Sequence, residues 1–151
     1  MEDIKGERLL YSCINMRKQL NKLLEGGELS NGEYLVLRNI AGQHKSGKGA
    51  FIRAAILSDH LELSRPSITR ILNSLESRGF ITREIDKADR RNITMEATEK
   101  GIAQLQKANK ALQGISQRLA GTLGEEDTER LIELIDRVAE TYKQIHNEKG
   151  E

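Results

Sequence analysis

"LSRPSITRILNSLESRGFITREIDKADRRNITMEATEKG", residues 63–101, is the stretch that decides the fold of this chain. Ser64 is a favoured helix N-cap, and Pro66 suits the first turn, where its missing N–H costs little. Gly79 suits the position just after a helix, where the chain reverses. Two segments with the alternation of strands, 80–85 and 92–97, enclose the charged loop DKADRR. The stretch therefore predicts a capped helix followed by a β-hairpin.

The predicted helix has an apolar side and a polar side. The apolar residues, three and four positions apart, are expected to be buried: Ile68, Ile71, Leu72 and Leu75. The polar residues are expected to be exposed: Arg65, Ser67, Thr69, Arg70, Asn73, Ser74 and Ser77. In the hairpin, residues of one parity are expected to share a buried face: Ile81, Ile85, Ile93, Met95 and Ala97.

A second helix is predicted directly before this one. Residues 52–63 read as a short strand followed by a helix, and a tight turn at 62–64 joins the two helices into a helix-turn-helix. In such a unit the second helix can enter the DNA major groove, with base contacts from its N-terminal half. Arg can grip guanine, and Ser or Thr can reach bases or phosphates. The alternative is a solvated polar face, although residues 65–77 contain one Glu and no Lys, unlike most surface helices.

The loop DKADRR, residues 86–91, has no glycine and carries five charges. It therefore suits a longer turn than a tight two-residue hairpin. An arginine at a hairpin tip can enter a narrow minor groove, where the negative potential is enhanced. We hypothesise that Asp89 aims Arg91 by a charge-assisted hydrogen bond. The alternative is an exposed ion pair worth less than about 1 kcal/mol.

Amphipathic helices are predicted on both sides of this unit. The first has an apolar stripe over residues 9–24 and ends at two glycines, 26–27. Ser30 and Glu33 form a capping box at the start of the next helix, which should end near Gly42. After Thr98 come two helices whose stripes, 105–119 and 131–145, resemble coiled-coil seams. The predicted fold class is mainly α, a winged helix-turn-helix over 30–97 flanked by helices over 1–29 and 98–151.

Composition bounds the class of protein. With 151 residues the chain suits one ordinary domain, and no apolar run reaches the roughly 18–20 residues of a membrane span. The N-terminus lacks the pattern of a secretion signal, and the single Cys excludes an intramolecular disulfide, as expected in the cytoplasm. Residues 64–91 hold seven basic and four acidic residues, whereas 125–151 hold four and nine. This asymmetry favours a polyanion as the partner of the middle of the chain.

The segment "ADRRNITMEATEKG", residues 88–101, resembles the wing signature of the MarR family of winged-helix transcription regulators, with Ala97 where Leu is usual. The resemblance implies a homodimeric regulator, most often a repressor, on a pseudo-palindromic operator in double-stranded DNA. It makes the helices over 1–29 and 98–151 the dimerisation helices. It makes Arg91 the minor-groove arginine, Asp89 its orienting partner, and Arg90 and Lys87 backbone contacts. The DNA-binding residues that it implies on the helix are Ser64, Arg65, Ser67, Thr69, Arg70, Asn73 and Ser74.

The family also implies a small aromatic or phenolic effector that releases DNA. Four residues are candidates for its cleft, although core packing explains them equally well: Met16, Arg17, Leu37 and Ile40. The chain departs from the family pattern at Glu62, where Gly is usual in the turn, and at Gly32, which interrupts the start of a helix. Arg53 stands where a capping Thr or Ser is common, and the loop 42–50 is unusually long.

Other signals are weak. "GQHKSGKG", residues 42–49, nearly matches a P-loop but lacks the Ser or Thr and the preceding strand. Cys13 lies on an apolar stripe, which favours packing over redox sensing. Three scattered histidines predict no metal site, and no nucleophile–base arrangement predicts an enzyme or a cofactor. The competing hypothesis is a winged helix that binds other proteins and no specific DNA.

Overall fold

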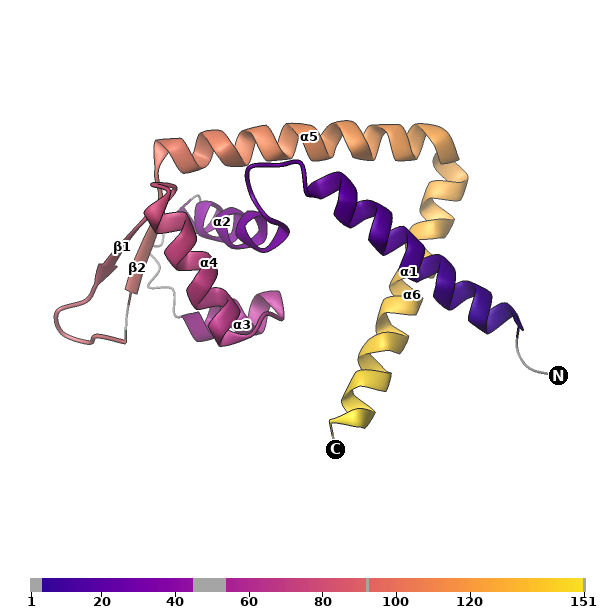
Figure 1. The fold of residues 1–151 in the computed structure, drawn as a ribbon, viewed down its shortest axis with the longest axis horizontal. Helices are drawn as coiled ribbons and strands as arrows, with labels where there is room; N and C mark the ends of the chain where they lie inside the picture. The colour runs from indigo at the N-terminus through magenta and orange to yellow at the C-terminus, as the bar shows by residue number, and fades with distance from the viewer. Residues whose placement is uncertain (1–3, 45–53, 92, 151) are drawn as a thin grey trace. The chain divides into compact units, whose positions relative to one another are not determined.

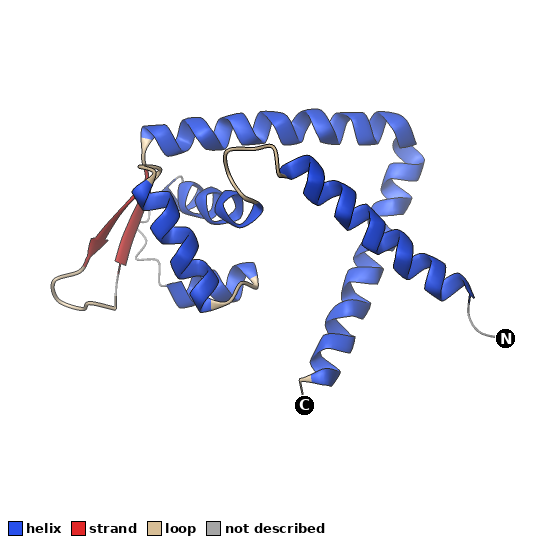
Figure 2. Ribbon diagram, viewed as in Figure 1, coloured by secondary structure: helices blue, strands red, loops and turns tan. Residues whose placement is uncertain are grey.

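The computed structural model describes residues 4–44, 54–91 and 93–150 (Figure 1). Its elements, in chain order, are α1 (Ile4–Leu24), α2 (Asn31–His44), α3 (Ala54–Leu61), α4 (Arg65–Ser77), β1 (Ile81–Ile85), β2 (Ile93–Ala97), α5 (Glu99–Leu123) and α6 (Glu125–Lys149). Helices dominate, and the two strands form a single antiparallel ribbon (Figure 2). The mainly helical class with a β-hairpin wing is confirmed. The short strand expected near Ile52 and the residue Arg53 lie outside the described residues.

The core lies between α2, α3, α4 and the hairpin. Its buried side chains are Leu29, Val36, Leu37, Ile40, Leu57, Ile68, Leu72, Leu75, Phe80, Ile81, Met95 and Leu105. With two Phe and no Trp in the chain, aliphatic side chains fill most of this space. Burial of aliphatic surface from successive elements holds the helix-turn-helix and the hairpin together. The apolar side predicted for α4 is buried as expected, with Ile71 only partly so.

Three turns have the capping chemistry that the sequence predicts. The Glu33 N–H donates to Ser30 Oγ at 3.1 Å, and the Ser30 N–H donates to Glu33 Oε2 at 2.9 Å, which is a complete capping box. Ser64 Oγ accepts from the Ser67 N–H at 3.2 Å at the start of α4. After α4, Gly79 takes a φ of 74°, the left-handed conformation that glycine adopts most easily. α2 continues to His44, two residues beyond the predicted end.

The hairpin pairs β1 with β2 in antiparallel register, with Ile81 opposite Ala97 and Ile85 opposite Ile93. Ile81 is buried, but Ile85 is 62% exposed. The expectation that both share a buried face is therefore wrong. On β2, Met95 is buried and Ile93, opposite Ile85, packs against the core, whereas Ile85 at the end of β1 is left uncovered. The alternation thus predicts burial correctly along β2 but only at the start of β1.

The start of α5 is attached to the base of the wing. The Thr98 hydroxyl donates to the Gly79 carbonyl at 2.6 Å and accepts from the Gly101 N–H at 3.0 Å. Gly101 is buried against the backbone of Phe80, where an added Cβ would lie 2.0 Å from the Phe80 carbonyl oxygen. Gly101 is therefore required by close packing and not by a special φ.

The chain divides into two compact units, 1–108 and 109–151. The first unit contains α1, the winged helix and the start of α5. The second contains the rest of α5 and α6. Within the described α1 and α6 no side chain is buried. Large apolar side chains are exposed on these helices and on α5, including Leu9, Tyr11, Ile14, Leu20, Leu119, Leu131, Ile135 and Ile145.

Candidate nucleic-acid interface

The N-terminal half of α4 presents a polar face with a defined set of hydrogen-bond donors. Arg65 is exposed and Arg70 donates through Nη2 to the Ser67 hydroxyl at 3.2 Å. Ser67 also receives a bond from Ser64 Oγ at 2.8 Å. The Thr69 hydroxyl donates to the Arg65 carbonyl at 3.0 Å, so its methyl group and oxygen lone pairs remain for outside contacts. This face can donate to acceptors on bases or phosphates chiefly through its arginines.

Farther along the same face, Asn73 is exposed and is held by a residue of the wing. Its Oδ1 accepts from Arg83 Nη2 at 2.8 Å. Arg83 also donates to both carboxylate oxygens of Glu76, from Nε and Nη2, each at 2.9 Å. These bonds raise the pKa of Arg83 and lower the pKa of Glu76. Arg83 therefore joins β1 to the exposed side of α4.

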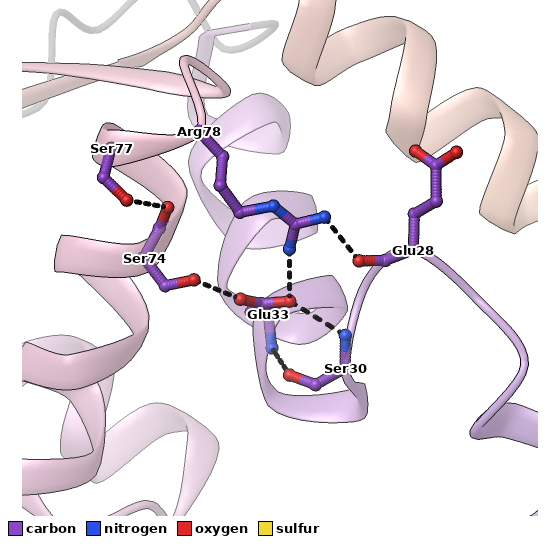
Figure 3. Close-up of polar contacts among 6 residues, drawn as sticks. All are labelled: Glu28, Ser30, Glu33, Ser74, Ser77 and Arg78. Atoms are coloured by element: carbon purple, nitrogen blue, oxygen red, sulfur yellow. Dashed lines mark hydrogen bonds and ion pairs between the residues drawn. The ribbon is translucent and has the colours of Figure 1, made fainter.

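The expectation that Ser74 lies on the exposed face of α4 is wrong, because Ser74 is half-buried. Its hydroxyl donates to Glu33 Oε1 at 2.6 Å, on the side of α4 that contacts α2 (Figure 3). The sequence spacing places Ser74 near the border between the buried and polar sides, and only the position of α2 decides which way its hydroxyl points. Ser77 is exposed and donates to the Ser74 carbonyl at 3.0 Å.

Glu33 is the centre of a network that holds the C-terminal end of α4. It is 8% exposed and accepts bonds from Ser74, from the Ser30 N–H and from Arg78 Nη1 at 3.1 Å (Figure 3). Burial opposes ionisation, but the bonds from Ser74 and Ser30 and the charge of Arg78 outweigh it and hold the pKa of Glu33 below its ordinary value. Arg78 also donates to the Glu28 carbonyl at 2.6 Å, which ties α4 to the turn before α2.

The wing loop is organised by its two aspartates. Asp86 Oδ1 accepts from the Ala88 N–H at 2.8 Å, and Asp89 Oδ1 accepts from the Arg91 N–H at 3.0 Å. Each bond spans two residues, as in Asx turns, which explains how the loop turns without glycine. Arg91 Nε lies 3.7 Å from Asp89 Oδ1, while the Arg91 side chain is 85% exposed. Lys87 and Arg90 are also exposed, so the loop presents three cations.

The turn between α3 and α4 places Glu62 at a φ of 53°. This is the left-handed region, in which a side chain is disfavoured and glycine is usual. The turn is closed by bonds from the Leu63 N–H to the Ser58 carbonyl, at 3.1 Å, and from the Ser58 hydroxyl to the Leu63 carbonyl. Gly32, another departure from the usual pattern, lies against α4, where an added Cβ would be 2.8 Å from Ile71 Cδ1.

The residues expected to line an effector cleft are not brought together. Leu37 and Ile40 are 0% and 1% exposed and belong to the core, whereas Met16 and Arg17 are exposed on α1. Core packing therefore explains the spacing of Leu37 and Ile40. A separate surface cavity of about 500 Å³ lies where α1 turns into α2. Its lining residues are Asn21, Leu24, Glu25, Gly27, Glu28, Leu29, Ser30, Asn31 and Glu33.

Other candidate sites gain little from the structure. Cys13 is half-buried on α1 and was expected to be fully packed. Among the described residues no group of three metal-ligating side chains is close enough to hold an ion. In the same part of the chain, no helix is long and apolar enough to cross a membrane. Residues 42–44 of the P-loop-like segment belong to α2, and the rest of that segment lies outside the described residues.

Sequence reasoning missed two arginines that organise this surface. Arg78 and Arg83 were counted only as positive charges, whereas the structure pairs them with Glu33 and Glu76. The Glu76 and Arg83 pair is seven residues apart across a turn and a strand, so no helical spacing signals it. The one signal in the sequence is that arginines lie on both sides of Gly79, and such arginines are expected to have acidic partners.

Comparison with known proteins agrees with this geometry. The sequence model of the MarR family matches residues 29–93. The HTH-type transcriptional regulator MhqR of Bacillus subtilis is 30% identical over 137 residues, which cover 91% of this chain and 89% of MhqR. The transcriptional repressor MprA of Escherichia coli is 31% identical over 106 residues, covering 66% of this chain. That match spans only 58% of the length of MprA.

Solved structures show the same fold. The transcriptional regulator SlyA superposes with a TM-score of 0.71 at 20% identity, covering 90% of this chain and 94% of SlyA. A Staphylococcus aureus MepR–DNA complex gives 0.70 at 19% identity, with 89% and 96% covered. PcaV of Streptomyces coelicolor, bound to its natural ligand, gives 0.69 at 18% identity, with 85% and 89% covered. The winged helix, the family match and the relation to MhqR together show that this chain belongs to the MarR family of winged-helix transcriptional regulators.

Proposed function

We propose that this chain represses transcription as a homodimer that binds a pseudo-palindromic operator in double-stranded DNA. The observation that carries the proposal is the polar face of α4, with Arg65 and Arg70 exposed at its N-terminal half, beside a wing loop that presents Arg90 and Arg91. A helix of this kind contacts base edges in the major groove, and an arginine at a wing tip suits the minor groove. Membership in the MarR family supports the same function.

The residues divide by the contact that each suits. Arg65 is exposed, and Arg70 is restrained by Ser67, so both can donate to base edges or phosphates. Ser64, Ser67 and Thr69 lie on the same face but use part of their hydrogen-bonding capacity within the helix. Lys87 and Arg90 suit the phosphate backbone because they are exposed on the wing. Ser74 is not proposed as a DNA contact, because its hydroxyl is bound to Glu33.

The proposed dimer rests on the helices outside the winged helix. α1, α5 and α6 leave many large apolar side chains exposed in the single chain, at spacings of three and four residues. Such stripes are stable in water when a second helix covers them. Sedimentation equilibrium should give twice the chain mass of 17.0 kDa. Substitution of Ile135 by Asp, on α6, should shift the protein toward the monomer, and a monomer at micromolar concentration in the unsubstituted chain would contradict the dimer.

DNA binding is tested by electrophoretic mobility shift with the intergenic DNA upstream of the chain's own gene, at two salt concentrations. We expect a specific complex whose affinity falls steeply with salt, because phosphate contacts release counterions. Arg65→Ala and Arg91→Ala should each cost roughly 1–3 kcal/mol of binding free energy. Arg130→Ala removes the same charge from α6 and should have little effect. Absence of a specific complex at both salt concentrations would contradict the proposal.

Repression is proposed because the relative MprA is named a transcriptional repressor. Deletion of the gene should raise transcription from the bound operator, and a fall would make the protein an activator instead. The protein would work in the cytoplasm, in contact with the DNA that it regulates. A winged helix that only binds other proteins would dimerise but would give no salt-dependent complex with DNA.

Release by a small aromatic or phenolic effector is part of the proposal. The fold of PcaV is shown with a bound natural ligand. In this chain, the cavity of about 500 Å³ at the α1–α2 turn is lined by Glu28 and Glu33, which also contact Arg78 at the end of α4. A phenol that donates to the Glu33 carboxylate would compete with the bonds from Ser74 and Arg78 that hold α4. Titration of the DNA complex with salicylate and related phenols should release DNA, and Glu28→Ala should change the concentration required.

A further inference from the structure

The orientation of one amide on α4 is set by the wing. Asn73 Oδ1 accepts from Arg83 Nη2 at 2.8 Å. The oxygen and nitrogen of an Asn amide are easily exchanged in a structure, but a guanidinium has only donors. The atom that faces Arg83 must therefore be the oxygen. The two N–H donors of the Asn73 amide are left for other partners.

Arg83 is itself held by Glu76, so its hydrogen bond to Asn73 fixes the orientation of the amide. Its Nε and Nη2 donate to the two carboxylate oxygens of Glu76, each at 2.9 Å. Nη2 carries two hydrogens, and these two bonds from Nη2, to Glu76 and Asn73, use both. The Arg83 side chain is 21% exposed and lies on β1, where its cross-strand neighbour is the buried Met95. Arg83 is thus a positioning residue for Asn73.

The four bases differ in what they offer to such an amide in the major groove. Guanine and thymine present keto oxygens, O6 and O4, which accept hydrogen bonds, whereas adenine and cytosine present amino groups, which donate. Both purines also present the acceptor N7, which adjoins a second acceptor in guanine but a donor in adenine. An Asn usually reads adenine with two bonds, one from its oxygen and one from its nitrogen. In this protein the amide oxygen already accepts from Arg83.

We infer that Asn73 is a specificity-determining residue that selects a keto base, guanine or thymine, because Arg83 holds the amide oxygen toward the wing and both amide N–H donors are left unbonded within the described part of the chain. The inference rests on the proposed function, since it requires α4 to enter the major groove. It adds a base class at one operator position, which neither the helix face nor the fold by itself specifies.

The test is selection of bound duplexes from a randomised DNA library by the full-length chain, followed by sequencing. Asn73→Ala should flatten the preference at one position in each half-site, and that position should show guanine or thymine with the unsubstituted chain. Asn73→Asp retains an acceptor for Arg83 but presents only acceptors to DNA, so the preference there should invert to adenine or cytosine, by about fivefold or more. Ser77→Asp adds the same charge one turn farther along α4 and should lower affinity without changing any base preference.

Two results would overturn the inference while leaving the proposed function intact. One is an adenine or cytosine preference of the unsubstituted chain at the position that Asn73→Ala flattens. The other is a half-site that is unchanged in both Asn73 variants. A third result, no enrichment of any sequence by the unsubstituted chain, would contradict the proposed function itself, and the inference with it.

Discussion

Arg83 on β1 binds Glu76 on α4 through two parallel hydrogen bonds, both 2.9 Å long. The two residues lie on either side of the turn at Gly79, so the pair closes a small loop between the helix and the wing. A bidentate arginine–carboxylate pair fixes both distance and angle. The wing and α4 are therefore expected to meet DNA as one rigid unit.

Glu76→Gln tests this Arg83–Glu76 pair by whether DNA affinity rises or falls. Removal of a negative charge near DNA should by simple electrostatics raise affinity. If the pair positions α4 and the wing, affinity should instead fall, by roughly two- to fivefold, since the pair is partly exposed. Fluorescence anisotropy with a labelled operator measures the difference. Glu84→Gln removes an exposed acid from β1, the strand that carries Arg83. It is the matched control, for which no loss of DNA affinity is expected.

The network around Glu33 predicts acid sensitivity. Because the pKa of Glu33 is lower in the folded chain than its ordinary value of 4.5, ionised Glu33 stabilises the fold above that pH. This stabilisation is lost as the pH falls from about 4.5 through the folded-state pKa. Urea unfolding of Glu33→Gln should show a loss of roughly 1–3 kcal/mol at pH 7. The variant should also lose less stability on acidification than the unsubstituted chain, and parallel pH profiles would refute this role.

The turn before α4 predicts a stabilising substitution. Glu62 has a φ of 53°, which costs a residue with a Cβ more than it costs glycine. Glu62→Gly should raise the free energy of unfolding by about 0.5–1 kcal/mol, after the added entropy of glycine in the unfolded chain is subtracted. Glu62→Ala removes the charge but keeps the Cβ. If Ala gives the same gain as Gly in urea unfolding, charge and not backbone conformation explains the effect.

The close contact of Gly101 with Phe80 predicts that a larger residue at position 101 destabilises the fold. Gly101→Ala places a Cβ 2.0 Å from a backbone oxygen, which cannot move without shifting the base of the wing. Overpacking of this kind typically costs about 1–3 kcal/mol. Gly42→Ala, on α2, is the control, because its Cβ meets nothing within 4 Å and a helix favours Ala over Gly. Thermal unfolding should therefore separate the two variants in opposite directions.

The wing loop predicts different effects for two substitutions of Asp89. The backbone bond to the Arg91 N–H, at 3.0 Å, is shorter than the 3.7 Å separation from Arg91 Nε. If Asp89 acts chiefly by shaping the turn, Asp89→Asn should keep near-normal DNA affinity, since an amide oxygen can accept the same bond. Asp89→Ala should weaken binding several-fold. Equal losses in both variants would show instead that the charge of Asp89 aims the Arg91 side chain.

Local rules of sequence accounted for much of this fold. The capping box of Ser30 and Glu33, the N-cap Ser64 and the reversal at Gly79 each depend on contacts within five residues, which sequence spacing specifies. The same holds for the apolar side of α4. The predicted burial of Ile85 is wrong because the core covers the inward residues of β2 but only the start of β1, and alternation along one strand carries no information on that.

By itself, the sequence determined the order of elements, the caps, the polar face of α4 and the wing signature that indicates the family. Only the tertiary structure decided that Ser74 points to Glu33, that Leu37 and Ile40 are core residues, and that Arg83 orients Asn73. The physical reason is the distance along the chain over which each interaction acts. Caps and amphipathic faces arise from hydrogen bonds and periodicity along one element, whereas the direction of a side chain at the edge of a face depends on which distant partner packs beside it.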